Sequence, residues 1–160
     1  MNKYKIEVKW ASAFVIMQLL WMLFEKLMGL HSQNIDKHPI YTNLVAIPSI
    51  AIYMFALLDK RKNYFQGTMT YKEGFITGVI ITFIVTLFAP LTQLIVSNII
   101  TPEYFPNVIK HSVNTGLMTE VEALKFFNLK SYIKQAVIGT PIMGMITTLI
   151  IAFLTKKKNS

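Results

Sequence analysis

The stretch FITGVIITFIVTLFAPLTQLIVSNII, from Phe75 to Ile100, contains no acidic, basic or histidine side chain. An α-helix rises 1.5 Å per residue, so about 20 apolar residues cross the hydrocarbon core of a bilayer. Backbone N–H and C=O groups find no water in that core and must pair within the segment, which favours a helix. The stretch therefore predicts a membrane-spanning helix that is long enough to tilt, or to bend at Pro90.

Three further segments of the chain have the same apolar character. We expect membrane-spanning helices over residues 10–30, 41–58 and 132–154, beside the one over 75–100. The composition agrees, since 53% of the residues are hydrophobic and 15% are charged, whereas a soluble domain carries about 25% charged residues. The chain has no cysteine, which excludes disulfides and Cys-based zinc sites. The prediction is an all-α, integral membrane four-helix bundle, with residues 1–160 forming one transmembrane domain.

Basic side chains gather on one side of this predicted topology. The N-terminal tail, the loop LLDKRKNYFQGTMTYK and the C-terminal tail TKKKNS carry most of the sixteen Lys and Arg residues. By the positive-inside rule we expect both termini in the cytoplasm. The formal net charge of +8 then reflects topology and contact with anionic lipids, so we expect no nucleic-acid partner. The first span lacks a small-residue cleavage site, which favours an uncleaved helix over a signal peptide.

The connection over residues 102–130 is too patterned to be a bare linker. We expect a helix over about 106–115, with Gly116 as its C-terminal stop. Thr119 and Glu122, in the sequence TEVE, form a capping-box pattern that predicts a second short helix. Both amphipathic helices are expected on the outer face of the protein. They either pack on the roof of the bundle, which we favour, or lie at the level of the lipid headgroups.

A glutamate interrupts the first span in the sequence LLWMLFEKLMGLH, from Leu19 to His31. Glu25 is expected in the outer third of the membrane, where an ionised carboxylate needs water or a partner. Polar side chains elsewhere in the spans reach a similar depth, and with Glu25 they form a predicted polar layer: Gln18, Gln93, Asn98 and Gln135. These groups either hold the helices in register, which we favour, or line an outward-facing pocket in which Glu25 binds a proton or cation.

All three histidines, His31, His38 and His111, are expected on the outer side of the membrane. Together with Asp36 or Glu103 they supply side chains of the types that bind zinc. Their spacing matches no defined metal motif, so they are weak candidates and we expect no metal site.

Gly74 and Gly78 form a GxxxG pattern at the inner start of the third span. Such spacing allows two helix backbones to approach closely. The contact is expected within the chain, and contact between two chains in a homo-oligomer stays open as the alternative.

The residues also resemble a known family. The resemblance rests on WMLFEKLMGLH, IDKHPIYTNL, LLDKRKN, MTYKEGFITG, PLTQ, ITPEYFPNVI and FFNLKSYI, which run from the first span to the start of the fourth. As a set they resemble an uncharacterised bacterial four-span membrane family, the domain-of-unknown-function family 4199. The resemblance implies a small integral protein of the bacterial inner membrane. It supplies no activity and no functional residues.

The sequence contains no pattern that argues for an enzyme: no nucleophile paired with a base, no phosphate-binding loop and no zinc-protease helix. We therefore expect no catalytic residue and no cofactor. The favoured function is a non-enzymatic scaffold or accessory subunit that contacts lipid and a membrane-protein partner. The alternative is a small oligomeric transporter, or a proton- or cation-coupled carrier that uses Glu25. The first is preferred because the spans lack a continuous polar route to the cytoplasm.

Overall fold

The computed structural model describes residues 3–157 of the chain. It contains four helical segments that are long and apolar enough to cross a membrane: α1 (Lys5–Leu27), Ile35–Asn63, Tyr71–Ile100 and α7 (Leu129–Thr155). The second segment comprises η1 (Ile35–Lys37), α2 (His38–Tyr41), η2 (Thr42–Val45) and α3 (Ala46–Asn63), and the third comprises α4 (Tyr71–Ile95) and the π-helical turn η3 (Val96–Ile100). The predicted all-α class is confirmed: within residues 3–157 the only β pairing is an isolated bridge between Met69 and Lys157.

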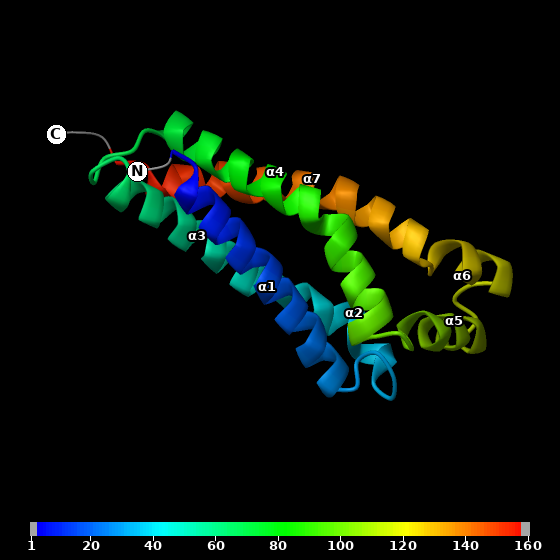
Figure 1. Cartoon of the computed structure of the whole chain (residues 1–160). Coiled ribbons are helices and arrows are strands. Elements are labelled where there is room, and N and C mark those ends of the chain that lie inside the picture. The colour runs from blue at the N-terminus through cyan, green and yellow to red at the C-terminus, as the bar shows by residue number, and fades with distance from the viewer. Residues whose placement is uncertain (1–2, 158–160) are drawn as a thin grey trace.

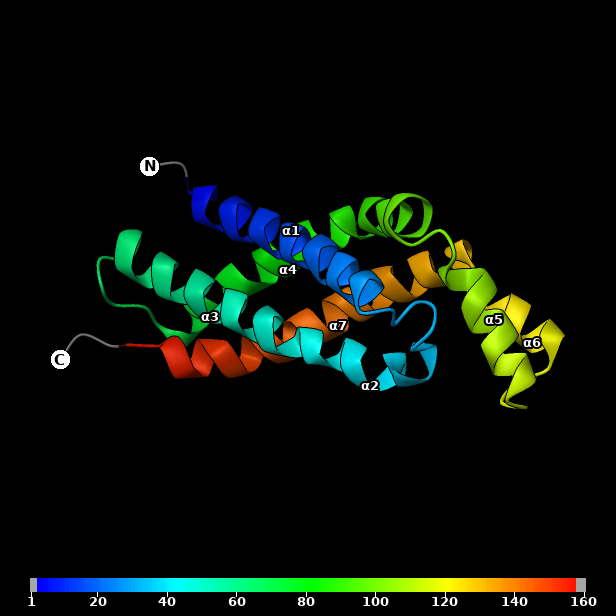
Figure 2. The ribbon, with the colours of Figure 1, turned by 90° about the horizontal axis from the view of Figure 1, so that it is seen from below.

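The four long helices lie side by side, with α1 against α3 and α4, and α7 against α3 and α4 (Figures 1 and 2). The start of α1, the α3–α4 loop and the end of α7 meet at one end of this assembly. There Arg61 donates to the carbonyl oxygen of Thr155 at 2.8 Å. Lys158, one of the basic residues of the C-terminal tail used to predict the topology, lies outside the described residues. The opposite end carries α2 and two shorter helices, α5 (Tyr104–Asn114) and α6 (Glu120–Phe126).

The hydrophobic core occupies the half of the assembly that is nearer to the termini. Its buried side chains come from all four long helices and from the α3–α4 loop: Ala11, Phe14, Tyr53, Ala56, Leu57, Met69, Ile81, Val85, Ile151 and Ala152. A few buried hydroxyls interrupt this apolar surface, among them those of Tyr53, Thr77, Thr82 and Thr148. The oxygens of Tyr53 and Thr82 lie 2.7 Å apart and share a hydrogen bond. This half of the protein is therefore an apolar core with a few buried hydroxyls.

Glycine sets the distance between α4 and α7. A Cβ atom added at Gly78 would overlap the side chain of Thr148, and one added at Gly144 would overlap Thr82. Gly74 faces Ala152, whose Cβ would lie 3.4 Å from the added atom. The structure thus places both residues of the predicted GxxxG pair, Gly74 and Gly78, in a close helix contact within the chain.

The ends of the two short helices α5 and α6 are set by local sequence signals. Helix α5 starts at Tyr104 rather than at the predicted 106, because a proline is tolerated within the first helical turn, where its missing N–H has no intrahelical acceptor. It ends before Gly116, which has a positive φ of 70°. The predicted capping box is present, with Thr119 and Glu122 exchanging hydrogen bonds at the start of α6. Helix α5 packs on η1 and α6.

Candidate functional site

The candidate site starts at the C-terminal end of α1, where the chain reverses direction. The N–H of Leu30 donates to the carbonyl of Glu25, and the N–H of Gly29 donates to that of Lys26. This pair of bonds is the Schellman motif, and it needs a left-handed residue, which Gly29 supplies with a φ of 71°. The reversal brings His31 back over the last turn of the helix, toward the side chain of Glu25.

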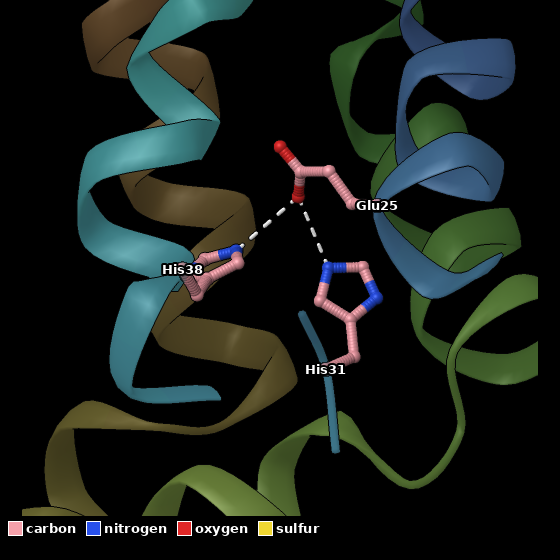
Figure 3. A group of neighbouring side chains, drawn as sticks. All are labelled: Glu25, His31 and His38. Carbon is pink, nitrogen blue, oxygen red and sulfur yellow. Dashed lines mark hydrogen bonds and ion pairs between the residues drawn. The ribbon is translucent and has the colours of Figure 1, made fainter. Parts of the chain in front are cut away.

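Two histidines converge on one carboxylate oxygen (Figure 3). His31 Nε2 lies 3.0 Å from Glu25 Oε2, and His38 Nε2 lies 3.3 Å from the same oxygen. Glu25 is 0% exposed and His31 is 4% exposed, while His38 reaches the site from the first residue of α2. A buried carboxylate, an interhelical loop and the start of the second span thus meet at a single point.

The second carboxylate oxygen of Glu25 has its own donor. Trp21 lies one turn earlier on α1, and its Nε1 donates to Oε1 at 2.5 Å. The carboxylate is thereby fixed in orientation, with Oε1 turned to the indole and Oε2 turned to the imidazoles. This accounts for an acid within a membrane-spanning helix, because its charge is met by hydrogen-bond donors instead of lipid.

Tyr104 of α5 packs on the rings of both histidines. Its ring centroid lies 5.2 Å from the ring centroids of both His31 and His38, and its hydroxyl oxygen lies 3.2 Å from that of Tyr132 on α7. Burial raises the pKa of Tyr104 above its ordinary value of 10.0, and Tyr132 and the charge of Glu25 raise it further. The phenol therefore stays neutral and closes the site with an apolar ring face.

The loop that carries His31 is held from α5 as well. Asn107 donates from Nδ2 to the backbone carbonyl of His31 at 2.9 Å. By contrast, the Nδ1 atom of His31 is buried without a hydrogen-bond partner among residues 3–157. Because an ionised carboxylate only accepts hydrogen bonds, the contact with Glu25 Oε2 favours the tautomer of His31 that carries its proton on Nε2.

The structure does not join the other members of the predicted polar layer to Glu25. Gln18 and Gln93 line a pocket of about 160 Å³ that lies between α1, η2, α4 and α7, with Trp21 in its wall. Gln93 bonds to Ser97, Asn98 to the carbonyl of Leu94 and Gln135 to Ser131, each four residues away on its own helical segment. Asn98 and Gln135 are exposed. Each of these amide nitrogens therefore bonds one turn away within its own helical segment and not to a neighbouring helix.

The three predicted histidines are divided by the fold. His31 and His38 meet Glu25 and not Asp36 or Glu103, the acidic residues considered with them in the sequence. His111 lies on α5 beside a separate shallow pocket, with Ser32, Asn107, Lys110 and Asn114. The sequence does contain a signal for the observed group. Gly29, a glycine that can end a helix, lies between the acid Glu25 and the imidazole of His31.

The arrangement has a metal-ligating composition. Glu25, His31 and His38 each offer one ligand atom, and these three atoms lie within 4.8 Å of one another.

The comparisons with known proteins identify a family but no activity. A family model described as a protein of unknown function (DUF4199) matches residues 9–157. The searches of curated proteins and of solved structures find no match.

Proposed function

Because the chain belongs to the DUF4199 family of proteins of unknown function, we propose from its own chemistry that it is a non-enzymatic accessory protein of the bacterial cytoplasmic membrane. Its working site is an ion- or proton-binding centre at the outer end of α1. The observation that carries this proposal is the convergence of two imidazoles on the fully buried carboxylate of Glu25. Intramembrane acids are energetically expensive and mark functional sites more often than packing sites.

The proposed orientation has the α3–α4 loop and both termini in the cytoplasm. Lys60, Arg61, Lys62 and Lys72 lie in or beside that loop, and Lys156 and Lys157 lie at the same end of the assembly. Such an excess of basic residues near the ends of spans favours the cytoplasmic side. The centre at Glu25 then faces the outer side of the membrane, where it exchanges its ligand with the periplasm.

Binding without transport is favoured by the hydrophobic core that lies between Glu25 and the end of the assembly that holds the termini. Phe14 is eleven positions earlier on α1, about 16 Å further inward at 1.5 Å per residue. At that level Phe14, Leu57, Ile81 and Ile151 are buried in the hydrophobic core. Among the described residues this layer holds a few buried hydroxyls, such as those of Tyr53 and Thr82, but no buried acid or base that would carry an ion or proton onward.

A carrier is the second candidate, and one observation favours it. The pocket beside Trp21 extends inward from the centre and is lined in part by polar side chains: Gln18, Thr42, Thr92, Gln93 and Thr140. Such a pocket is the kind of outward-facing vestibule that a carrier needs. The accessory function is preferred because the vestibule ends on the hydrophobic core.

Proteoliposomes loaded with a pH-sensitive dye separate the two functions. We expect the full chain to support no proton or cation flux, with either wild-type protein or Glu25→Gln. Hydrogen exchange on the same samples should show that Glu25→Gln loosens residues 31–45 and 104–114 while the inner helices stay protected. Glu120→Gln, an exposed acid on α6, is the matched control and should leave both regions unchanged. A flux that Glu25→Gln abolishes would overturn the accessory function in favour of the carrier.

A further inference from the structure

We infer that Glu25, His31 and His38 form a binding site for a divalent transition-metal ion of the zinc class. The inference rests on the proposed outer binding centre and names the ligand of that centre. It concerns the three side chains that converge in Figure 3.

The separation of the ligand atoms fits such an ion. In a tetrahedral zinc site with bonds of about 2.0 Å, neighbouring ligand atoms lie about 3.3 Å apart. Glu25 Oε2 lies 3.0 Å from His31 Nε2 and 3.3 Å from His38 Nε2, and the whole set lies within 4.8 Å. Small rotations of the two imidazoles bring all three atoms to bonding distance from one point.

The type of ligand selects the class of metal. Two imidazole nitrogens and one carboxylate oxygen suit Zn²⁺, Fe²⁺, Co²⁺ or Ni²⁺, whereas Mg²⁺ and Ca²⁺ prefer sets made of oxygen. Trp21 holds Oε1 of Glu25, so the carboxylate offers one oxygen only. A monodentate carboxylate between two imidazoles is a poor calcium ligand set and a good zinc one.

The surroundings supply orientation and shelter. Trp21 fixes the carboxylate, Asn107 fixes the backbone of His31, and Tyr104 packs on both imidazole rings. Such outer partners commonly orient metal ligands. Binding of an ion would displace the Nε2 proton that Glu25 accepts, and the proton would then sit on His31 Nδ1, which has no partner within the described part of the chain.

The competing account uses the same contacts without a metal. In it, both Nε2 atoms carry protons and donate to Oε2 of Glu25, and the cluster fastens the outer loop to α1. The two accounts predict different responses to metal. In the metal account, an ion replaces the two hydrogen bonds by three coordinate bonds and binds in a fixed ratio to the chain. In the metal-free account, the chain has no specific affinity for the ion.

The test uses the full chain, purified in detergent and stripped of metal with a chelator. Titration with Zn²⁺ alone in a calorimeter should show one ion per chain. Titration with Co²⁺ should give the intense visible absorption of a four-coordinate site, in contrast to the weak absorption of the hydrated ion. His38→Gln and Glu25→Gln should each weaken Zn²⁺ binding by more than about a hundredfold, because each removes a direct ligand, whereas losing an outer partner costs about 10–100-fold.

Two further variants separate a metal site from nonspecific binding and from misfolding. His111→Gln removes an imidazole from α5, away from the cluster, and should bind Zn²⁺ as the wild-type chain does. Trp21→Phe should keep the stoichiometry and weaken affinity about 10–100-fold, because it releases the carboxylate without removing a ligand. Circular dichroism and gel filtration check that each variant is folded.

The inference is overturned if the folded wild-type chain binds no Zn²⁺, or if the double variant His31→Gln/His38→Gln binds it equally well. In either case, the absence of Glu25-dependent flux would leave the proposed accessory function standing. A Glu25-dependent flux would overturn that function whether or not zinc binds, so the two failures are distinguishable.

Discussion

Lys60 of α3 and Glu7 of α1 form a buried ion pair, with Nζ 2.8 Å from Oε1 and both side chains nearly inaccessible to solvent. Lys60 also donates to the carbonyl of Lys3 at 2.6 Å and lies 3.8 Å from the ring centroid of Tyr64. Beside this pair, Lys9 and Trp10 both donate to Asp59 Oδ2 at 2.7 Å. The N-terminal part of α1 and the C-terminal part of α3 are therefore joined by charge-assisted hydrogen bonds at the end of the assembly that holds the termini.

Removing one member of this pair should destabilise the protein. Lys60→Met leaves the Glu7 carboxylate buried without its counter-charge, and we expect the free energy of unfolding to fall by about 3–5 kcal/mol. Reversible unfolding of the chain in mixed micelles measures the change. Lys62→Met, at an exposed position of the same helix, should change it by less than about 0.5 kcal/mol. The double variant Glu7→Leu/Lys60→Met should recover most of the loss, and a double variant as unstable as Lys60→Met alone would refute the account.

The close approach of α4 and α7 gives a second prediction. Gly78→Val places methyl groups where Thr148 already lies, and we expect the overpacking to cost about 1–3 kcal/mol of stability. Gly139→Ala is the matched control, because an added Cβ there meets nothing within 4 Å. Replacing a helical glycine by alanine without a clash is expected to leave stability unchanged or raise it by up to about 1 kcal/mol. Equal losses in the two variants would show that the α4–α7 distance does not depend on Gly78.

The ring and the hydroxyl of Tyr104 should contribute separately. Tyr104→Phe keeps the ring against His31 and His38 and loses only the hydroxyl contact with Tyr132, so we expect a loss of about 1 kcal/mol. Tyr104→Ala removes the buried ring, with an expected loss of about 3–5 kcal/mol. Hydrogen exchange over residues 31–41 should rise strongly in Tyr104→Ala and little in Tyr104→Phe. Similar exchange in both variants would mean that the ring does not cover the site.

The start of α6 should respond to acid. Hydrogen bonds from the Thr119 hydroxyl and then from its backbone N–H hold the pKa of Glu122 below its ordinary value of 4.5. Because the folded-state pKa is the lower one, the capping contribution is complete above the unfolded-state pKa and is lost as pH falls through the folded-state pKa. The Cα chemical shifts of α6 should therefore move toward coil values at acidic pH.

Replacing the titrating group tests that assignment. Glu122→Gln should make the α6 chemical shifts nearly independent of pH, whereas Glu120→Gln, which removes an acid outside the capping box, should preserve the transition. An unchanged acid transition in Glu122→Gln would assign it to another group.

Much of the fold follows from the sequence because apolar length and helix-ending signals are local. The uncharged stretch 75–100, Gly116 and the Thr119–Glu122 box each correspond to observed features. A second capping box, Thr70 with Glu73, has the same T-x-x-E pattern and was not predicted. It starts α4, with Thr70 as the N-cap residue.

The candidate site follows from the sequence only in part. That Glu25 needs polar neighbours can be predicted from the sequence, because an ionised carboxylate is costly in lipid without them. Which side chains become those neighbours depends on how the loop turns at Gly29 and on where α2 begins, and both are properties of the assembled fold. The pair of Glu7 and Lys60 was missed for the same reason, since its members are 53 positions apart in the chain.

The two glycine–threonine contacts between α4 and α7 have a consequence for biosynthesis. The groove at Gly78 is filled by Thr148, and the one at Gly144 is filled by Thr82, so α4 cannot complete its packing until the C-terminal helix has left the ribosome and entered the bilayer. Until then its glycine face is open to lipid or to a chaperone. A nascent chain that stalls before Leu129 therefore leaves the Gly78 surface of α4 without its helix partner.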